Sequence, residues 1–303
     1  MSSGSSADGY FKGKVIVITG ASSGFGKGAA LEFARSGATI IVSARRSQLL
    51  DELAKECDSL GGHGVAIPAD VSFKDEVEHL AKSAVSAAGR IDVWVNNAGT
   101  GALGPFEEVP PEEHVQVIET DLLGTLYGSY FAMRQFRKQG FGTLINVSSM
   151  IGKVPSPYFA SYAAAKSGVV GLSASIRQEL KENNIDGIRV STILPTSMDT
   201  PFFEHAANYM QRKTVPIPPI EEAQKVVDGI VKMARDPEDE ISVGTSAPFL
   251  TFAHRIAPDL TEALMARRVH KAEVEQAPPA ENTPGAVQQP MARGSSVGGG
   301  WKR

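Results

Sequence analysis

Cysteine is nearly absent from this sequence of 303 residues, which contains only Cys57. A single cysteine excludes an intrachain disulfide, and this fits a protein of a reducing compartment. Cys57 lies in a charged stretch with the pattern of a helix, so we interpret it as structural rather than reactive. The sequence also contains no group of His, Cys and Asp residues with the spacing of metal ligands, and we expect no bound metal.

Long hydrophobic runs are missing as well. No apolar run approaches the roughly 18 residues that a membrane-spanning helix needs. The first ten residues, MSSGSSADGY, have neither the basic region nor the apolar region of a secretory signal. We therefore expect a cytoplasmic protein with no membrane span and a disordered N-terminus over residues 1–9.

A large excess of charge is also lacking. Lys and Arg number 30, Asp and Glu number 34, and the net charge is only -4. No basic block is interleaved with aromatic residues, so nothing predicts binding to nucleic acid or to an anionic membrane. The apolar content of 42% is ordinary for a globular protein, and this length allows one substantial core.

Short apolar runs alternate with segments of helical periodicity. The runs are apolar at nearly every position, which is typical of strands buried on both faces of a parallel sheet. Such an alternation predicts right-handed crossovers and a three-layer, doubly wound α/β domain. The predicted strands cover 14–19, 38–43, 64–68, 91–96, 142–147, 187–194 and 240–244, and the predicted helices cover 27–36, 48–60, 74–88, 111–139, 158–182 and 220–234.

Three segments near the C-terminal end do not follow this alternation. Residues 195–219 form a long loop rich in Pro, Thr and aromatic residues, and such a loop is usually functional. Residues 249–269 are predicted to form an extra amphipathic helix that could cover the sheet edge, cap the substrate cleft, pair with another subunit or touch a membrane. Residues 271–303 are rich in Pro, Gly, Gln and Ser and predict a disordered tail, which leaves 10–270 as the folded domain.

A glycine-rich stretch, TGASSGFG at residues 19–26, joins the first predicted strand to the first helix. Glycines let the backbone turn tightly and approach an anion, and a helix N-terminus offers free N–H groups to a pyrophosphate. Because of this placement we predict a dinucleotide site, with a tight turn that binds nothing as the alternative. The predicted contacts are Gly20, Ser22, Ser23, Gly24, Phe25 and Gly26.

Tyr162 and Lys166 lie four residues apart in the stretch SYAAAKSG and so share one face of a predicted helix. An isolated phenol has a pKa near 10 and is a poor base at neutral pH. A nearby ammonium favours the phenolate and lowers that pKa, which would fit Tyr162 to donate or accept a proton. On its own, however, a Tyr–Lys pair is an ordinary helix contact.

These motifs, in this order, resemble the short-chain dehydrogenases/reductases. The pattern G-x-x-x-G-x-G, the sequence NNAG at 96–99, Ser149 thirteen residues before Tyr162, and Lys166 four residues after it all match, over roughly residues 10–244. The resemblance implies a single Rossmann-type domain with a seven-stranded parallel sheet, a nicotinamide cofactor, and hydride transfer between an alcohol and a carbonyl. It implies Tyr162 as general acid and base, Lys166 as its partner and a ligand of the nicotinamide ribose, and Ser149 as a hydrogen-bond donor to the substrate oxygen. It also implies a homo-oligomer, for which we favour a dimer.

The end of the second strand indicates which cofactor binds. Ala44 stands where NAD-preferring relatives usually carry an aspartate, and Arg45 and Arg46 follow. A guanidinium binds a phosphate bidentately, so we predict NADP(H), with Arg45 as the main contact and Arg46 or Ser22 assisting. The alternatives are NAD(H) and two solvated arginines at a helix start. By resemblance, further cofactor contacts are Asp70, Val71, Asn97, Ala98, Gly99, Pro195, Thr196 and Thr200.

Asp121, in the sequence ETDLLG, is a departure from the family, which often has an asparagine there that holds a water on a proton relay. Aspartate keeps the acceptor oxygens but loses the amide donor. Its charge could also pair with Lys166 and weaken the pull of that lysine on Tyr162. This puts the efficiency of the relay in question, and an inert core or capping role is the alternative for Asp121.

Apolar residues near the predicted site favour a small-molecule substrate, an apolar secondary alcohol or ketone. The same residues could instead pack the loop or a subunit interface. His205 is expected to be a solvated loop residue. The alternatives for the whole chain are an NAD(H)-dependent reductase of acyl-chain or steroid ketones, and a catalytically idle dinucleotide sensor or scaffold. The apolar residues are Met150, Ile151, Tyr158, Phe159, Phe202, Phe203, Tyr209 and Met210.

Overall fold

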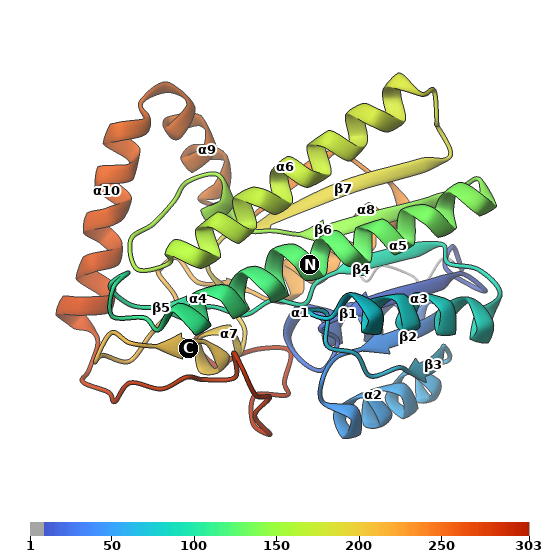
Figure 1. Cartoon of the computed structure of the whole chain (residues 1–303), viewed down its shortest axis with the longest axis horizontal. Coiled ribbons are helices and arrows are strands. Elements are labelled where there is room, and N and C mark those ends of the chain that lie inside the picture. The colour runs from blue at the N-terminus through green and yellow to red at the C-terminus, as the bar shows by residue number, and fades with distance from the viewer. Residues whose placement is uncertain (1–8, 303) are drawn as a thin grey trace, which may run out of the picture.

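Seven parallel strands form the central sheet, in the order β11-β7-β6-β4-β1-β2-β3 (Figure 1). The computed structural model describes residues 9–302, so most of the predicted N-terminal disorder lies outside the described residues. All seven predicted strands are confirmed to within a few residues. They are β1 Val15–Thr19, β2 Thr39–Ser43, β3 His63–Ala66, β4 Val93–Asn96, β6 Gly142–Val147, β7 Ile188–Pro195 and β11 Glu240–Val243.

Helices cover both faces of this sheet and give the predicted three-layer arrangement. Successive residues of β1 point to opposite faces, so Ile16 and Ile18 pack in one core and Val15 and Val17 in the other. This explains why the strand sequences are apolar at every position. On the first face lie α1 Gly24–Arg35, α2 Ser47–Ser59 and α8 Gln224–Arg235, and on the second lie α3 Lys74–Ala88, α5 Gly124–Gln139 and α6 Ala160–Glu182.

The strand order reverses between β1 and β4. From β1 the chain moves outward to β2 and β3, then returns to β4 on the other side of β1 and continues to β6 and β7. In open α/β sheets, ligands bind at such a reversal, beyond the carboxyl ends of the strands. The glycine-rich stretch and NNAG both follow strands at this edge. The topology therefore brings together motifs that lie 70 residues or more apart in sequence.

Cys57 is fully buried on α2 against the backbone of α1. Burial raises the pKa of its thiol to about 12, and the neighbouring carboxylates of Glu56 and Asp58 add to the effect. Because the thiolate is the reactive form, this thiol is inert at neutral pH. The structural interpretation of Cys57 is therefore supported.

The loop over 195–219 is held to the body by two small pairs of strands. Within it, β8 Met198–Asp199 pairs with β10 Glu221–Glu222, and β9 Ala207–Asn208 pairs with β5 Ala102–Leu103. The short helix α7 Phe202–His205 lies between β8 and β9. Backbone pairing thus orders a segment that has no long helix of its own.

The extra helix predicted over 249–269 is instead two helices, α9 Ala247–Ile256 and α10 Pro258–His270 (Figure 1). The break falls at Ala257, whose backbone is not helical. Pro258 has no N–H to donate and disfavours the helical conformation of the residue before it. It is well suited to the first turn of the next helix, so the chain restarts there.

The tail predicted to be disordered follows a defined path in the structure. A π-helical turn, Lys271–Gln276, is followed by a segment that runs back along β9 toward the start of α1 (Figure 1). The amide of Asn208 donates to the carbonyl of Thr283 at 2.8 Å, and the amide of Lys213 donates to that of Pro278 at 2.8 Å. The composition predicted disorder because little apolar surface is available, but these contacts use backbone groups, which composition does not reveal.

Glu273, in the π-helical turn, is a fully buried carboxyl with one partner, the amide of Val215 at 3.4 Å. Burial raises its pKa from 4.5 to about 7. A carboxyl whose pKa is raised on folding stabilises the folded state at pH values below its pKa in the unfolded chain. This stabilisation is lost as pH rises from about 4.5 to about 7. At 1.36 kcal/mol per pKa unit, the loss is at most about 3 kcal/mol.

We therefore expect Glu273→Gln, which cannot ionise, to change the pH dependence of stability. Relative to the native chain, the variant should become progressively more stable as pH rises through this window. Urea unfolding at about pH 5 and about pH 8 measures the difference. Parallel pH dependences of the two proteins would contradict the burial of an ionisable carboxyl at this position.

Within residues 9–302, no helix has the length and apolar character needed to cross a membrane.

Candidate active site

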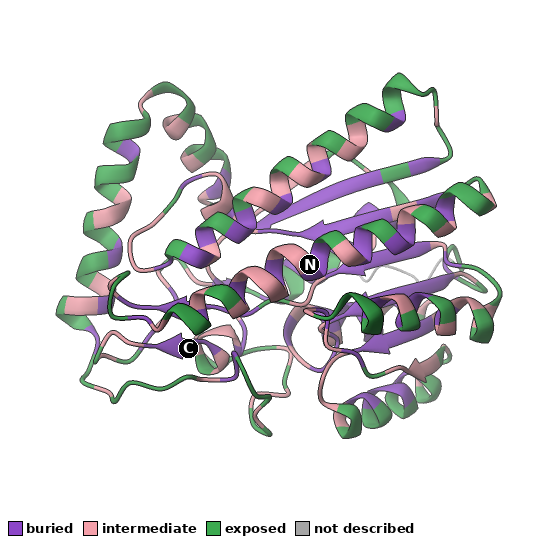
Figure 2. Ribbon diagram, in the orientation of Figure 1, coloured by how far each residue is buried: buried purple, intermediate pink, exposed green. Residues whose placement is uncertain are grey.

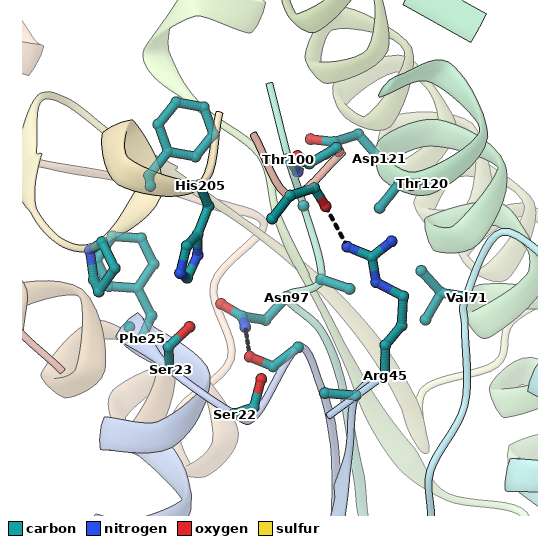
Figure 3. Close-up of a pocket in the computed structure, with 18 of the residues that line it drawn as sticks. Ser22, Ser23, Phe25, Arg45, Val71, Asn97, Thr100, Thr120, Asp121 and His205 are labelled. Atoms are coloured by element: carbon teal, nitrogen blue, oxygen red, sulfur yellow. Dashed lines mark hydrogen bonds between the residues drawn. The ribbon is translucent and has the colours of Figure 1, made fainter. Parts of the chain in front are cut away.

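The glycine-rich loop packs so closely on its neighbours that side chains would not fit. Gly20 and Gly24 have φ angles of +64° and +55°, which favour glycine. A Cβ atom on Gly20 would lie 2.7 Å from the Cα atom of Ala98, and one on Gly26 would lie 2.5 Å from the Gly20 carbonyl oxygen. The amide of the Asn97 side chain donates to the carbonyls of Thr19 and Gly20 and fixes the loop to β4 (Figure 3). Glycine is therefore required at these positions, where the loop passes close to the end of β4.

This loop borders a cavity of about 200 Å³ at the sheet reversal (Figure 3). Most of the predicted site residues line it, but Gly26 only supports the loop, and Ser149, Pro195 and Thr196 border a second cavity. The predicted residues in the lining are Gly20, Ser22, Ser23, Gly24, Phe25, Arg45, Arg46, Asp70, Val71, Asn97, Ala98, Gly99, Asp121, Tyr162, Lys166 and Thr200. The residues that were not predicted as contacts are Ala44, Ala69, Thr100, Thr120, Val147, Ser148, Pro201, Phe202, His205, Ala286, Pro290 and Met291.

Arg45 and Arg46 both reach into this cavity rather than into solvent. Arg45 donates from Nη2 to the carbonyl of Ala286 at 2.5 Å. Arg46 donates from Nε to the hydroxyl of Ser22 at 3.0 Å, so it ties the second strand to the glycine loop. Ala44, beside them, provides no carboxylate. The two guanidiniums form a donor set suited to an anionic group at this end of the cleft.

Tyr162 and Lys166 project from the first turns of α6 at the opposite end of the cavity. The Lys166 ammonium lies 5.5 Å from the centroid of the Tyr162 ring. It donates to the carbonyl of Val147 at 3.2 Å and lies 3.0 Å from Oδ2 of Asp121. Lys166 and Asp121 are almost fully buried, so the pair is shielded from solvent.

Asp121 lies in a π-helical turn, Glu119–Leu123, between α4 Pro111–Ile118 and α5. Such turns are frequent at functional sites. Its Oδ1 atom accepts from the amide of Thr100 at 2.7 Å, while Oδ2 pairs with Lys166. A Cβ atom on Gly99 would lie 3.0 Å from Oδ2 and 3.3 Å from the Lys166 ammonium, so a glycine is needed there. Asp121 is thus both a cap on a backbone amide and the partner of Lys166.

The pKa of Tyr162 is raised rather than lowered in this structure. Burial is the largest cause, and the Asp121 charge adds to it, whereas Lys166 and a hydrogen bond with Ser149 lower the pKa. Lys166 therefore acts in the predicted direction but does not outweigh burial. Burial lowers the pKa of Lys166 itself, but Asp121 and Tyr162 raise it above its ordinary value. Lys166 thus remains a cation beside Tyr162.

Ser149 and Tyr162 meet a second cavity of about 290 Å³ with mainly apolar walls. Ser149 follows β6 and caps the short 3-10 helix Met150–Gly152, where its hydroxyl accepts from the amide of Ile151 at 3.2 Å. Tyr158, Tyr209 and Met210 do not line this cavity, whereas the other five predicted apolar residues do. The two C-terminal helices also border it, through Phe249, Leu250, Met265, Arg268 and Val269. Of the alternatives for this segment, these contacts favour the one in which it caps the cleft.

His205 is not the solvated residue that the sequence indicated. It is half-buried at the end of α7, lines the first cavity, and its Nε2 atom lies 3.1 Å from the carbonyl oxygen of Arg293 (Figure 3). Burial lowers the pKa of its imidazole. The tail covers this side chain, and the sequence gives no sign of that long-range contact. In the described part of the chain, no three His, Cys, Asp or Glu side chains are grouped as metal ligands.

Comparisons of sequence and structure find similar oxidoreductases. The family model described as short chain dehydrogenase matches residues 14–210. The chain is 32% identical over 273 residues to "Uncharacterized oxidoreductase YxnA" of Bacillus subtilis (strain 168), covering 88% of this chain and 75% of that protein. It is 36% identical over 193 residues to the 3-oxoacyl-(acyl-carrier-protein) reductase FabG of Thermotoga maritima, covering 64% and 77%. The structure of an alcohol dehydrogenase from the archaeon Thermococcus sibiricus, complexed with 5-hydroxy-NADP, matches with a TM-score of 0.66 at 26% identity and covers 76% of this chain and 95% of that chain.

Proposed function

Because the chain belongs to the short-chain dehydrogenase family and is an NAD(P)-dependent oxidoreductase acting on CH–OH groups, we propose that it interconverts an apolar ketone and its secondary alcohol with NADP(H). The observation that carries this proposal is the position of Tyr162. Its side chain borders both the cavity at the glycine loop and the apolar cavity. A proton donor at that junction can protonate the carbonyl oxygen of a substrate bound in the apolar cavity while the cofactor is bound in the cavity at the glycine loop.

The residues at the first cavity fit a dinucleotide. The glycine loop packs tightly on the protein behind it, as the short contacts of Gly20 and Gly26 show, and Gly20 and Gly24 border the cavity with backbone alone. Arg45 and Arg46 would hold the 2′-phosphate of NADP(H), and Ala44 offers no charge to repel it. The Thermococcus sibiricus structure, complexed with 5-hydroxy-NADP, supports this choice.

In carbonyl reduction, Tyr162 would donate its phenolic proton to the substrate oxygen, and the Ser149 hydroxyl would donate a hydrogen bond to the same oxygen. The nicotinamide, when bound, supplies the hydride that reaches the carbonyl carbon. The Lys166 ammonium stabilises the phenolate left on Tyr162. Asp121 fixes the ammonium in place through its 3.0 Å contact. Oxidation of the alcohol reverses each proton transfer.

Burial is the main cause of the raised pKa of Tyr162, so the phenol is protonated at neutral pH. A phenol that stays protonated at neutral pH is the form that a carbonyl substrate needs. Oxidation needs the phenolate, which this environment disfavours. Asp121 contributes to that bias because its charge also raises the pKa of Tyr162.

Apolar ketones are the substrates that the second cavity favours. Met150, Phe159 and Phe203 are among its walls, and Ser149 and Tyr162 are the polar groups at the site of reaction. A pocket with apolar walls and a few convergent polar groups selects apolar substrates with one reacting group. A panel of aliphatic, acyl-chain and steroid ketones, assayed with NADPH through the loss of nicotinamide fluorescence, tests the proposal. NADPH-dependent turnover of none of these ketones would overturn it.

Replacing Arg45 by alanine should weaken NADPH binding by about 10- to 100-fold, because a hydrogen bond to a charged group contributes about 1.5–3 kcal/mol. NADH has no 2′-phosphate, so its affinity should not fall. Fluorescence titration with each nucleotide measures both constants. Arg35→Ala is a matched control, since Arg35 is an exposed arginine paired with Glu32 on the first helix. Equal losses for NADPH and NADH would contradict the assignment of Arg45.

A catalytically idle dinucleotide-binding protein is the second candidate, and Asp121 is the residue that favours it. Its charge, 3.0 Å from the Lys166 ammonium, raises the pKa of Tyr162, whereas Lys166 lowers it. Turnover of any ketone with NADPH would reject this candidate. A protein that binds NADPH but turns over no ketone would support it.

The homo-oligomeric and cytoplasmic expectations remain part of the proposal. A second subunit could cover apolar side chains that are 57–72% exposed on the two C-terminal helices (Figure 2). Sedimentation equilibrium of the full chain determines the number of subunits. The exposed residues are Phe249, Phe252, Ile256, Leu260 and Leu264.

A further inference from the structure

The C-terminal segment over 285–302, here called the strap, contacts the donors that would bind the phosphates of a dinucleotide. Arg45 donates to the carbonyls of Ala286, Val287 and Gln288 at 2.5–3.2 Å. Arg46 donates from Nη1 to three further strap carbonyls. These are the carbonyls of Met291, Arg293 and Gly294, at 3.1–3.5 Å.

The strap also accepts a hydrogen bond from the glycine loop. The amide of Gly24, the first residue of α1, donates to the carbonyl of Ser296 at 2.9 Å. In dinucleotide-binding folds, a pyrophosphate oxygen accepts from an amide at this helix N-terminus. The strap therefore presents carbonyl oxygens both to the predicted 2′-phosphate contacts and to the predicted pyrophosphate contact.

We propose that the strap is an internal competitor of the cofactor, which must leave Arg45, Arg46 and Gly24 before a dinucleotide can bind. This inference rests on the proposed NADP(H) dependence. The strap is therefore an autoinhibitory segment built into the chain.

The strap also narrows the cavity at the glycine loop. With the strap in place the cavity is about 200 Å³, and Ala286, Pro290 and Met291 form part of its wall. Sites that bury a drug-sized ligand usually have roughly 300–1,000 Å³. The strap therefore leaves less room at this end of the cleft than such sites usually have.

Displacement of the strap by a phosphate is chemically reasonable. A backbone carbonyl is a neutral acceptor, whereas a phosphate carries negative charge, so Arg45 and Arg46 would form ion pairs with it that they cannot form with a carbonyl. The strap also buries few apolar side chains, of which Val287 is the most buried, so little hydrophobic free energy is lost when it leaves.

The far end of the strap has contacts that do not involve Arg45, Arg46 or Gly24. The Asp199 carboxylate accepts from the amides of Gly299 and Trp301 at 2.8 and 2.9 Å, and the Trp301 indole donates to the carbonyl of Thr200 at 3.1 Å. The strap can therefore swing out while its end stays attached. A competitor that is tethered to the protein acts at high effective concentration. It therefore lowers the apparent affinity of any ligand that binds to the same groups.

Substitution of two glycines of the strap tests the proposal without changing any residue outside the strap. Gly285 and Gly294 have φ angles of +57° and +70°, and a Cβ atom on either would lie within 2.4 Å of His205 or Ala206 atoms. Gly285→Val with Gly294→Val should therefore prevent the strap from closing. Gly298→Ala is the matched control, because its nearest neighbours would lie 4.0 Å away.

The probes are NADPH and adenosine 2′,5′-bisphosphate, with dissociation constants measured by fluorescence titration and calorimetry. We expect the double variant to bind both at least about tenfold more tightly than the native chain, and the control to bind them unchanged. Unchanged or weaker binding in the double variant would overturn the competition, and weaker binding would make the strap part of the binding site. Failure of the native chain and both variants to bind either probe would overturn the NADP(H) proposal itself.

Trypsin provides an independent readout that does not depend on activity. Arg293 lies in the strap, pairs with Glu204 and is a cleavage site. If the cofactor displaces the strap, adenosine 2′,5′-bisphosphate should speed cleavage after Arg293 in the native chain. Slower cleavage would show that the strap closes over the ligand and would overturn the proposal.

Discussion

Replacing Tyr162 by phenylalanine should reduce kcat for ketone reduction by about 10²- to 10⁴-fold, the usual contribution of a positioned general acid. The change removes only the hydroxyl that we propose as the proton donor. The ring packs with those of Phe159 and Phe202, at centroid distances of 6.3 and 5.2 Å, and phenylalanine keeps both contacts. The variant should therefore fold and bind NADPH like the native chain. Steady-state kinetics together with a NADPH titration measure both properties.

Tyr209→Phe is the matched control for this experiment. Tyr209 lies in the same apolar cluster as Tyr162 but lines neither cavity. It should lose little activity. If Tyr162→Phe keeps native turnover, the assignment of the proton donor is wrong, whereas a joint loss of turnover and NADPH binding would point to a structural defect.

The sequence predicted the fold well because parallel strands leave a strong local signal. Val15 to Ile18 supply apolar side chains to both faces of the sheet, and that pattern is visible without any long-range information. The glycine loop is equally local, since a strand, a turn and a helix follow one another in the chain. The position of Lys166 relative to Tyr162 follows from helical spacing alone.

The pairing of Asp121 with Lys166 was predicted only as one possibility. The two residues are 45 positions apart in sequence. Their contact depends on the π-helical turn that carries Asp121, and the sequence pattern does not reveal that turn. The raised pKa of Tyr162 was missed for a related reason. Sequence shows the neighbouring charge of Lys166 but not the burial that outweighs it.

The C-terminal end was predicted least well, for two different physical reasons. The helix break could have been predicted, because Pro258 stands in the middle of the expected helix. The path of the strap could not. Composition indicates how much apolar surface a segment can bury. The strap is held instead by backbone carbonyls, which accept hydrogen bonds from Arg45, Arg46 and Gly24. Every residue has such a carbonyl, so the sequence does not show which ones will be used.

Replacing Lys166 by methionine should lower the free energy of unfolding by about 3–5 kcal/mol, because it leaves the buried Asp121 carboxylate without its cation. Urea unfolding measures this loss. Burial already raises the pKa of the Asp121 carboxyl, against the effect of Lys166. Without Lys166 that pKa must rise further. A carboxyl whose pKa is raised on folding stabilises the folded state at low pH, so the loss should shrink as pH falls.

The matched partner of this variant is the double change Lys166→Met with Asp121→Asn. Asparagine is neutral and keeps an oxygen to accept from the amide of Thr100, as Oδ1 of Asp121 does at 2.7 Å. The double variant should therefore recover most of the lost stability, although not activity, since Lys166 is absent. Equal stabilities for the single and double variants would mean that the loss comes from packing of the lysine chain. Recovery would show that Asp121 and Lys166 depend on each other, so that the aspartate at this site is tolerated because the lysine is charged.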